Sequence, residues 1–141
     1  MNDEPGDDEG ILDTNALILL GRLEDASRLP RSPSITTITL AELSVGPHVA
    51  RDDTERAARQ AHLQQAEADF EPLPFDAAAA RAFGKVASDL RAAGRKPAAR
   101  AYDALIASVA VSRGLPLYTA NPDDFAGITG LDVVALSVSD V

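Results

Sequence analysis

Four acidic residues stand beside short apolar runs and are the side chains in this chain best suited to chemistry. They are Asp13 in ILDTN, Glu42 in TLAEL, Asp103 in YDALIAS and Asp124 in NPDDF. The chain has no cysteine, only two histidines and no glycine-rich phosphate loop. Any catalysis would therefore depend on carboxylates, and clustered carboxylates usually need a divalent cation. Hard oxygen ligands of this kind favour Mg2+ or Mn2+ over Zn2+.

The net charge of −9 is concentrated at the N-terminus. Residues 1–10 hold five of the 22 acidic residues and none of the 13 basic ones, so the rest of the chain carries 17 acids against 13 bases, or −4. We interpret residues 1–10 as a disordered acidic tail and residues 11–141 as a single domain. The overall acidity does not exclude an RNA substrate, but it requires that phosphate contacts be local.

The sequence gives no sign of a membrane or secreted protein. No apolar run approaches the roughly 20 residues that a membrane-spanning helix needs. The acidic N-terminus lacks the basic and apolar regions of a secretory signal. The absence of cysteine excludes a disulfide scaffold and is compatible with a reducing compartment. We therefore expect a cytoplasmic protein with no membrane partner.

Short strands are expected to alternate with helices along the chain. We expect strands at 11–12, 34–37, 73–75, 117–119 and 133–136, and helices at 15–21, 53–69, 77–93 and 101–113. Another short helix is expected to begin at Thr39, because Thr39-Leu-Ala-Glu42 matches the Ser/Thr-x-x-Glu capping box, and to end before Pro47. This alternation predicts an α/β fold, a three-layer α/β/α sandwich with a central parallel sheet.

The predicted topology brings three of the four acids to one edge of the sheet. Ligands of open parallel sheets bind beyond the carboxyl ends of the strands. Asp13 directly follows the first strand, Glu42 lies in the first turn of the helix after the second, and Asp124 follows 117–119. The position of Asp103, early in the helix before 117–119, is not forced by topology. Taken singly, each acid can also be explained as a helix cap, a dipole partner or a turn residue.

The order of these motifs resembles the PIN-domain family, and most closely the VapC-type toxin ribonucleases of bacterial toxin–antitoxin pairs. The resemblance covers residues 11–136, and its most specific stretch is the Asp103 helix followed by GLPLYTANPDDF. The residues that match the family's acidic positions are Asp13, Glu42, Asp103 and Asp124. Thr119 and Asn121 match polar positions that support the site.

The resemblance implies a PIN-like fold and a Mg2+- or Mn2+-dependent endoribonuclease. It also implies a toxin that forms a homodimer and is neutralised by a cognate antitoxin protein. Asp13 and Asp103 are expected to bind the metal directly, and Glu42 and Asp124 are expected to complete the catalytic site. The side chains expected to orient these carboxylates are Thr14, Asn15, Thr119 and Asn121.

Two positions depart from a simple match to this family. Asp123 lies beside Asp124 and is an alternative fourth acid, although the Asn-x-x-Asp-Phe spacing selects Asp124. Only Ile11 and Leu12 precede Asp13 after the acidic tail, whereas family members have three to five apolar residues there. We therefore expect a short first strand.

The basic residues before Asp103 and the side chain of Tyr102 each allow two interpretations. A basic cluster before Asp103 could guide RNA phosphates to the acids, or it could be a solvated helix end; its members are Arg91, Arg95, Lys96 and Arg100. We expect His48 and His62 on the surface and Tyr102 in the core, although Tyr102 could instead stack on a base. The residues expected in the core are Phe70, Phe75, Phe83 and Phe125.

Two alternative functions remain open from the sequence. The first is a haloacid-dehalogenase-like phosphatase with Asp13 as nucleophile, although Asn15 stands where that pattern has a second aspartate. The second is a non-catalytic RNA-binding module that retains the PIN-like fold. Detection of an acyl-phosphate on Asp13 would favour the phosphatase, and a lack of Mg2+ or Mn2+ binding would favour the module.

Overall fold

A parallel β-sheet forms the centre of the computed structural model, which describes residues 8–96 and 100–139. Within these residues the sheet has four strands in the order β2-β1-β3-β4. The strands are β1 (Glu9–Leu12), β2 (Ser32–Ser34), β3 (Leu117–Thr119) and β4 (Val133–Ala135). Ile11 pairs with Ser34 on one side and with Leu117 on the other, and all three strand pairs are parallel. The predicted central parallel sheet is therefore confirmed.

The strand order reverses between β1 and β3. The chain passes outward from β1 to β2, returns to pair β3 with β1, and then passes outward again to β4. Such a reversal opens a crevice beyond the carboxyl ends of the two central strands, where ligands bind in open α/β sheets. The N–H of Asp13 donates to the carbonyl of Tyr118 over 3.1 Å and joins the two strand ends. The residues that follow β1 and β3 therefore meet at this crevice.

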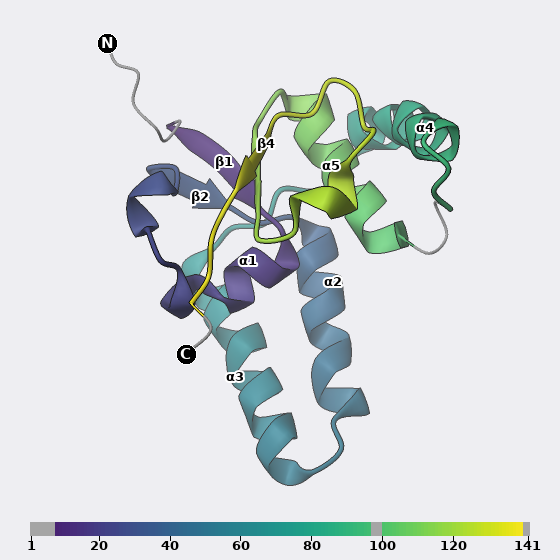
Figure 1. The fold of residues 1–141 in the computed structure, drawn as a ribbon. Coiled ribbons are helices and arrows are strands. Elements are labelled where there is room, and N and C mark those ends of the chain that lie inside the picture. Colours follow the sequence, from purple (N-terminus) through teal and green to yellow (C-terminus); the bar gives the residue numbers. More distant parts are fainter. Residues whose placement is uncertain (1–7, 97–99, 140–141) are drawn as a thin grey trace.

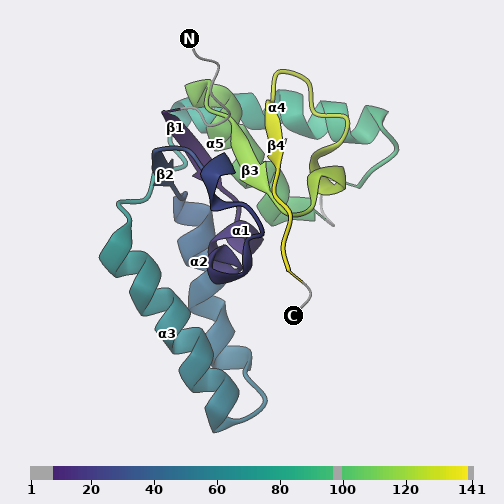
Figure 2. The same cartoon turned by 60° about the vertical axis from the view of Figure 1, so that its left-hand side comes forward.

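Helices and 3-10 turns connect the strands (Figures 1 and 2). The helices are α1 (Thr14–Ile18), α2 (Thr37–Val45), α3 (Asp53–Asp69), α4 (Ala77–Ala92) and α5 (Ala101–Arg113). The 3-10 turns are η1 (Leu20–Arg22), η2 (Ala26–Arg28), η3 (Gly46–Val49) and η5 (Pro122–Phe125). Both views show α2 and α3 as a hairpin that projects away from the sheet.

The two faces of the sheet are buried by different helices. Side chains alternate between the faces along a strand. Ile11 and Leu117 accordingly belong to a hydrophobic cluster with residues of α4 and α5. Their neighbours Leu12 and Tyr118 belong to a second cluster with residues of α1, α2 and α3. This arrangement confirms the predicted three-layer α/β/α sandwich.

The helices with clear end signals lie where the sequence predicts them. Helix α3 begins after Asp52, whose carboxylate accepts from the N–H of Glu55 over 2.8 Å. Helix α4 begins after Asp76, which accepts from the N–H of Ala79 over 3.0 Å. Helix α5 ends at Gly114, which has a φ of 66° that favours glycine. In each case a local interaction fixes the end of the helix.

The start of α2 differs from the sequence prediction. Thr36 is the N-cap, and its hydroxyl accepts from the N–H of Thr39 over 3.2 Å. The helix therefore begins at Thr37, and the predicted capping box of Thr39 and Glu42 is wrong. Glu42 lies in the second turn of α2 rather than in the first. The preceding strand is shifted as well, because β2 covers 32–34 and not 34–37.

Three further boundaries need correction. The predicted strand at 73–75 is wrong, since Leu73 makes only an isolated bridge to Thr36. The predicted helix at 15–21 divides into α1 and the 3-10 turn η1. Strand β1 starts at Glu9, so the last two residues assigned to the acidic tail belong to the sheet. Residues 1–7 of that predicted tail lie outside the described residues.

The predicted surface and core residues agree with the structure except at Tyr102. Its side chain is 46% exposed, so the expectation that it packs in the core is wrong. His48 and His62 are exposed, as predicted. Among the phenylalanines Phe125 is buried, whereas the other three are partly buried against the core; these are Phe70, Phe75 and Phe83. In the part of the chain that the structure describes, no helix is long and apolar enough to cross a membrane.

Gly10 packs directly on a buried ring, and its replacement is predicted to destabilise the protein. A Cβ at Gly10 would lie 2.4 Å from Cε1 of Tyr118, which is fully buried. We expect Gly10→Ala to lower the free energy of unfolding by about 1–3 kcal/mol because the core is overpacked. Chemical denaturation monitored by circular dichroism measures this change.

The matched control is Gly84→Ala in the exposed middle of α4. A Cβ there meets no atom within 4 Å. This substitution should raise the free energy of unfolding by about 0.5–1 kcal/mol, because alanine loses less conformational entropy than glycine in a helix. Equal effects of the two substitutions would contradict the packing of Gly10 on Tyr118.

Candidate active site

Asp13 lies at the carboxyl end of β1 and is the N-cap of α1. Its side chain is 4% exposed and receives two hydrogen bonds. The N–H of Ala16 donates to Oδ1 over 2.8 Å, and the hydroxyl of Thr119 donates to Oδ2 over 2.6 Å. Burial raises the pKa of Asp13, the two hydrogen bonds oppose this shift, and the charge of Asp124 adds to it. Asp13 is therefore a buried carboxylate with a fixed orientation.

Glu42 faces α1 from the second turn of α2. The hydroxyl of Thr14 donates to Oε1 of Glu42, and the Thr14 and Thr39 hydroxyl oxygens lie 2.9 Å apart. Because the Thr14 hydrogen is engaged with Glu42, Thr39 acts as donor to Thr14. Burial raises the pKa of Glu42, the bond from Thr14 opposes this, and the charge of Asp13 adds to the increase.

Asp103 lies in the first turn of α5 and is half-buried. Its pKa is raised to about 6, first by burial and then by the negative charges of the other three acids, Asp124, Asp13 and Glu42. The positive charge of Arg100 partly opposes these effects. Mutual repulsion of this kind requires proximity. The structure therefore places the four predicted acids within electrostatic range of one another, including the one that topology left unplaced.

Asp124, rather than Asp123, is directed at this group of acids. Asp124 lies in the 3-10 turn η5, and Nη1 of Arg100 donates to its Oδ1 over 2.6 Å. The adjacent Asp123 is exposed. The turn is closed by the N–H of Asp124, which donates to the carbonyl of Asn121 over 3.0 Å. The position of Asp124 agrees with the motif spacing, and its role as the fourth acid stays a prediction.

The four carboxylates offer the right ligand chemistry for Mg2+ or Mn2+ but are not arranged as a finished cage. Among the residues described here, no three acidic or histidine side chains converge closely enough to hold an ion. Three of the acids are instead engaged by neighbours: Asp13 by Thr119, Glu42 by Thr14 and Asp124 by Arg100. Side-chain rotation, above all release of Asp124 from Arg100, would be needed for joint coordination. The all-oxygen donor set fits a hard divalent cation.

The four polar residues expected to orient the carboxylates fall into two pairs. Thr14 and Thr119 each donate to a carboxylate, as expected for such a role. The hydroxyl of Thr119 also accepts from the backbone N–H of Asn121 over 2.9 Å. The side chains of Asn15 and Asn121 are exposed and make no hydrogen bond to an acid within the described residues. Asn15 lines a cavity next to Glu42 instead.

The predicted basic cluster does not act as one unit in the structure. Arg100 is bound to Asp124 and belongs to the acidic group. Arg91 is in the last turn of α4 and is exposed, and Arg95 and Lys96 follow that helix. In the described regions these three side chains form no hydrogen bond or ion pair with the four acids, and they remain candidates for contact with RNA phosphates.

Sequence reasoning missed the contribution of α3 to the surroundings of Glu42. Arg59 and His62 line the cavity beside Glu42, yet His62 was expected only on the surface and Arg59 was not singled out. They are three residues apart and therefore share one face of the helix. That spacing was visible in the sequence, but nothing local indicated which face of α3 lies beside α2.

Comparisons with known proteins agree with this fold and identify the family of the chain. The PIN domain family model matches residues 11–131. Ribonuclease VapC5 of Mycobacterium tuberculosis is 42% identical over 123 residues, covering 86% of this chain and 88% of that protein. Ribonuclease VapC1 of Rickettsia felis is 28% identical over 133 residues, covering 92% and 98%.

The fold is also that of a solved protein. A chain in the crystal structure of VapBC-5, a member of the VapBC family of toxin–antitoxin systems from Mycobacterium tuberculosis, matches with a TM-score of 0.78 and 39% identity. The match covers 93% of this chain and 99% of that one. The chain therefore belongs to the PIN-domain family and, within it, to the VapC group.

Proposed function

We propose that this protein is a Mg2+- or Mn2+-dependent endoribonuclease that hydrolyses RNA phosphodiester bonds. The observation that carries the proposal is that four acids from distant segments lie within electrostatic range of one another near the crevice beyond β1 and β3. Asp103 experiences the negative charge of the other three, Asp13, Glu42 and Asp124. Such a concentration of like charge is costly for a fold unless a cation offsets it. Relatives with the name ribonuclease support the same reaction.

Each acid has a distinct role in the proposed reaction. Asp13 and Asp103 would hold the cation directly, and Glu42 and Asp124 would complete the site. A bound divalent cation supplies Lewis-acid stabilisation of the charge that develops on the scissile phosphate. Thr119 and Thr14 fix the orientation of Asp13 and Glu42 through their hydroxyl groups. Arg100 is close enough to the acids to contact a phosphate once Asp124 is released.

The biological role proposed here is that of a toxin controlled by an antitoxin protein. The matched VapBC-5 structure is described as a member of a toxin–antitoxin family, which supports this assignment. We further propose that the protein forms a homodimer and cleaves RNA in the cytoplasm. A cationic segment of the antitoxin could pair with the acidic group and block it.

The two alternative functions receive less support. The phosphatase alternative needs a second aspartate at the position of Asn15, and membership of the PIN-domain family provides no reason to expect that reaction. The non-catalytic module is compatible with the fold, but it offers no reason to keep four mutually repelling carboxylates. Cleavage assays separate the module from the nuclease.

One prediction of this function concerns the two proposed direct metal ligands. The double variant Asp13→Asn, Asp103→Asn should lose RNA cleavage by about 100-fold or more, because several kcal/mol of transition-state stabilisation depend on the cation. Asparagine can still cap α1 at position 13, so the fold should persist. Cleavage of labelled RNA in Mg2+ or Mn2+, together with a thermal melt, measures both effects. Full cleavage by this variant, purified free of other nucleases, would refute the proposal.

The neighbouring aspartates of η5 provide a matched pair of variants. Asp124→Asn should reduce cleavage by about tenfold or more, because Asp124 faces the acidic group. Asp123→Asn should leave cleavage unchanged, because that side chain is exposed. The opposite ranking of the two variants in the same assay would show that the fourth acid is Asp123.

The raised pKa of Asp103 predicts a pH dependence of stability in the metal-free protein. The folded-state pKa of Asp103 is raised to about 6 from an ordinary 3.8, so between these values the folded state binds more protons than the unfolded one. The contribution of Asp103 to stability therefore falls as the pH rises from about 4 to 6. Chemical denaturation in EDTA should show the free energy of unfolding fall by roughly 1 kcal/mol over this pH range. The full pKa shift would give a larger loss, but solvent screens the half-buried carboxyl group.

The variant Asp103→Asn isolates this effect from other titrations. It should be more stable than the wild type at pH 7.5 in EDTA and nearly equal to it at pH 4. Added Mg2+ or Mn2+ should stabilise the wild type at pH 7.5 far more than the variant, by linkage between binding and folding. Parallel pH profiles for the two proteins would contradict the placement of Asp103 among the other acids.

A further inference from the structure

A cavity of about 280 Å3 is lined in part by Glu42. It is enclosed by residues of α1, α2 and α3, including Asn15 and Ile18 from α1 and Arg59 and His62 from α3. Of the four acids, Glu42 forms part of its wall, so the cavity borders the acidic group at this residue. The reaction proposed above makes no use of this space.

The walls of the cavity combine apolar and polar groups. Ile18 and Leu43 supply the apolar surface, and the Ile18 side chain is 39% exposed. The Asn15 side chain is exposed and makes no hydrogen bond within the described residues, so its amide can both donate and accept. The exposed imidazole of His62 stands on the opposite helix.

Arg59 is held in place before any ligand arrives. Its Nη1 donates to the carbonyl of Gly46 over 3.0 Å, and its Nη2 donates to Glu55 over 2.9 Å. The stem of Arg59 packs on Gly46, where an added Cβ would lie 3.1 Å from the Arg59 Cδ. A planar guanidinium fixed in this way loses little conformational entropy on binding.

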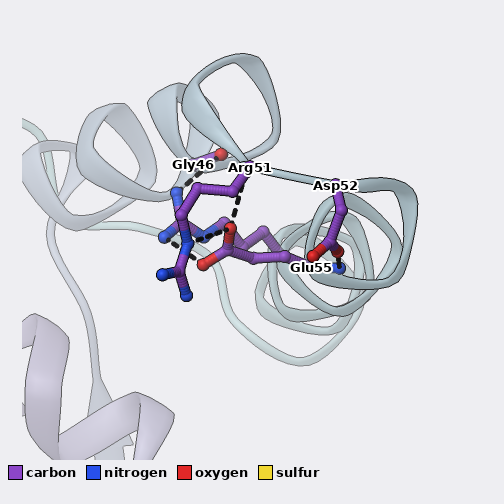
Figure 3. A network of polar contacts seen from close by, with 5 residues as sticks. Gly46, Arg51, Asp52 and Glu55 are labelled. Atoms are coloured by element: carbon purple, nitrogen blue, oxygen red, sulfur yellow. Dashed lines mark hydrogen bonds and ion pairs between the residues drawn. The ribbon is translucent and has the colours of Figure 1, made fainter.

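Arg59 shares its carboxylate partner, Glu55, with a second arginine. Glu55 is shared, because the N–H and Nε of Arg51 also donate to it over 2.6 Å and 3.3 Å (Figure 3). The N–H of Glu55 donates in turn to Asp52, which caps α3. Two arginines therefore share one carboxylate. The formal charges of residues 51–59 cancel, with three arginines against Asp52, Asp53 and Glu55, and Arg59 supplies its guanidinium to the cavity wall.

These features suit a nucleobase better than an isolated phosphate. A base has two apolar faces and a polar edge, and proteins hold unpaired bases by stacking on aromatic rings or guanidinium planes and by hydrogen bonds to the edge. The cavity volume is slightly below the range typical of pockets for small molecules, which begins at about 300 Å3. A phosphate would need neither Ile18 nor Leu43 and would be repelled by Glu42.

We propose that this cavity binds one unpaired base of the RNA substrate beside the scissile phosphate. Arg59 and His62 stack on or contact the base, and Asn15 reads its edge. These residues then contribute to the choice of cleavage sequence. The inference rests on the proposed ribonuclease function and extends it to substrate recognition.

The test compares cavity residues with matched residues outside the cavity. His62→Ala and Arg59→Lys remove the imidazole and the guanidinium plane. The controls are His48→Ala and Arg56→Gln. His48 is an exposed histidine in η3, and Arg56 is an arginine of α3 that pairs with Asp53. Thermal melts check that each variant folds; Arg59→Lys keeps the positive charge, and His62 is exposed, so neither change is expected to unfold the protein.

Two readouts are required. The first is the distribution of cleavage sites in a random-sequence single-stranded RNA library, mapped by sequencing the product ends. His62→Ala and Arg59→Lys should relax or change the preference at one nucleotide position, while the two controls keep the wild-type preference. The second is the affinity for short labelled single-stranded RNA in the non-cleaving Asp13→Asn, Asp103→Asn background. Both cavity variants should weaken it by about tenfold or more, since base stacking contributes on that scale.

The outcomes separate this inference from the ribonuclease assignment. If the wild type cleaves RNA and both cavity variants keep its site preference and affinity, the base subsite is wrong and the nuclease stands. If the cavity variants cleave normally but escape inhibition by the cognate antitoxin, the cavity belongs to the protein partner and the inference is overturned. If the wild type cleaves no RNA in Mg2+ or Mn2+, the proposed function fails, while the affinity readout still shows whether the cavity holds a base.

Discussion

The repulsion among four carboxylates is the constraint on which the rest of this structure depends. The reversal of strand order places the ends of β1 and β3 side by side, so Asp13 and the residues after Thr119 must meet. Helices α2 and α5 then add Glu42 and Asp103 to the same space. The pKa of Asp103 shows the result, since three neighbouring negative charges contribute to its increase. The fold thus concentrates like charge where stability alone would spread it.

The structure limits this repulsion through specific donors rather than through solvent. Asp13 is nearly inaccessible and relies on the Ala16 N–H and the Thr119 hydroxyl. Glu42 relies on Thr14, and Asp124 on Arg100. A buried carboxylate that accepts such hydrogen bonds keeps its charge more readily than one without them. The same bonds fix the direction in which each carboxylate points, which matters for binding a cation with strict geometry.

The sequence could predict those elements whose ends are set by local chemistry. Helices α3 and α5 lie at the predicted residues because an aspartate cap and a left-handed glycine define an end of each. It could not predict the start of α2, because Thr36 and Thr39 are both acceptable caps and only the pairing of the preceding strand decides between them. Nor could it place Asp103, whose position depends on how α5 packs across the sheet. The exposure of Tyr102, next to Asp103, depends on the same packing.

The corrected start of α2 has a direct consequence for the site. With Thr36 as the cap, Thr39 and Glu42 lie three residues apart inside the helix and share one face. That face meets Thr14, whose hydroxyl contacts both side chains and forms a polar link between α1 and α2. Had Thr39 been the N-cap, its hydroxyl would have accepted a hydrogen bond from a backbone N–H of the first turn. The hydroxyl of Thr39 instead donates to Thr14, whose own hydroxyl donates to Glu42, and Glu42 also lines the cavity beside α3. One change of helix start therefore determines both the orientation of a proposed catalytic carboxylate and the wall of the neighbouring cavity.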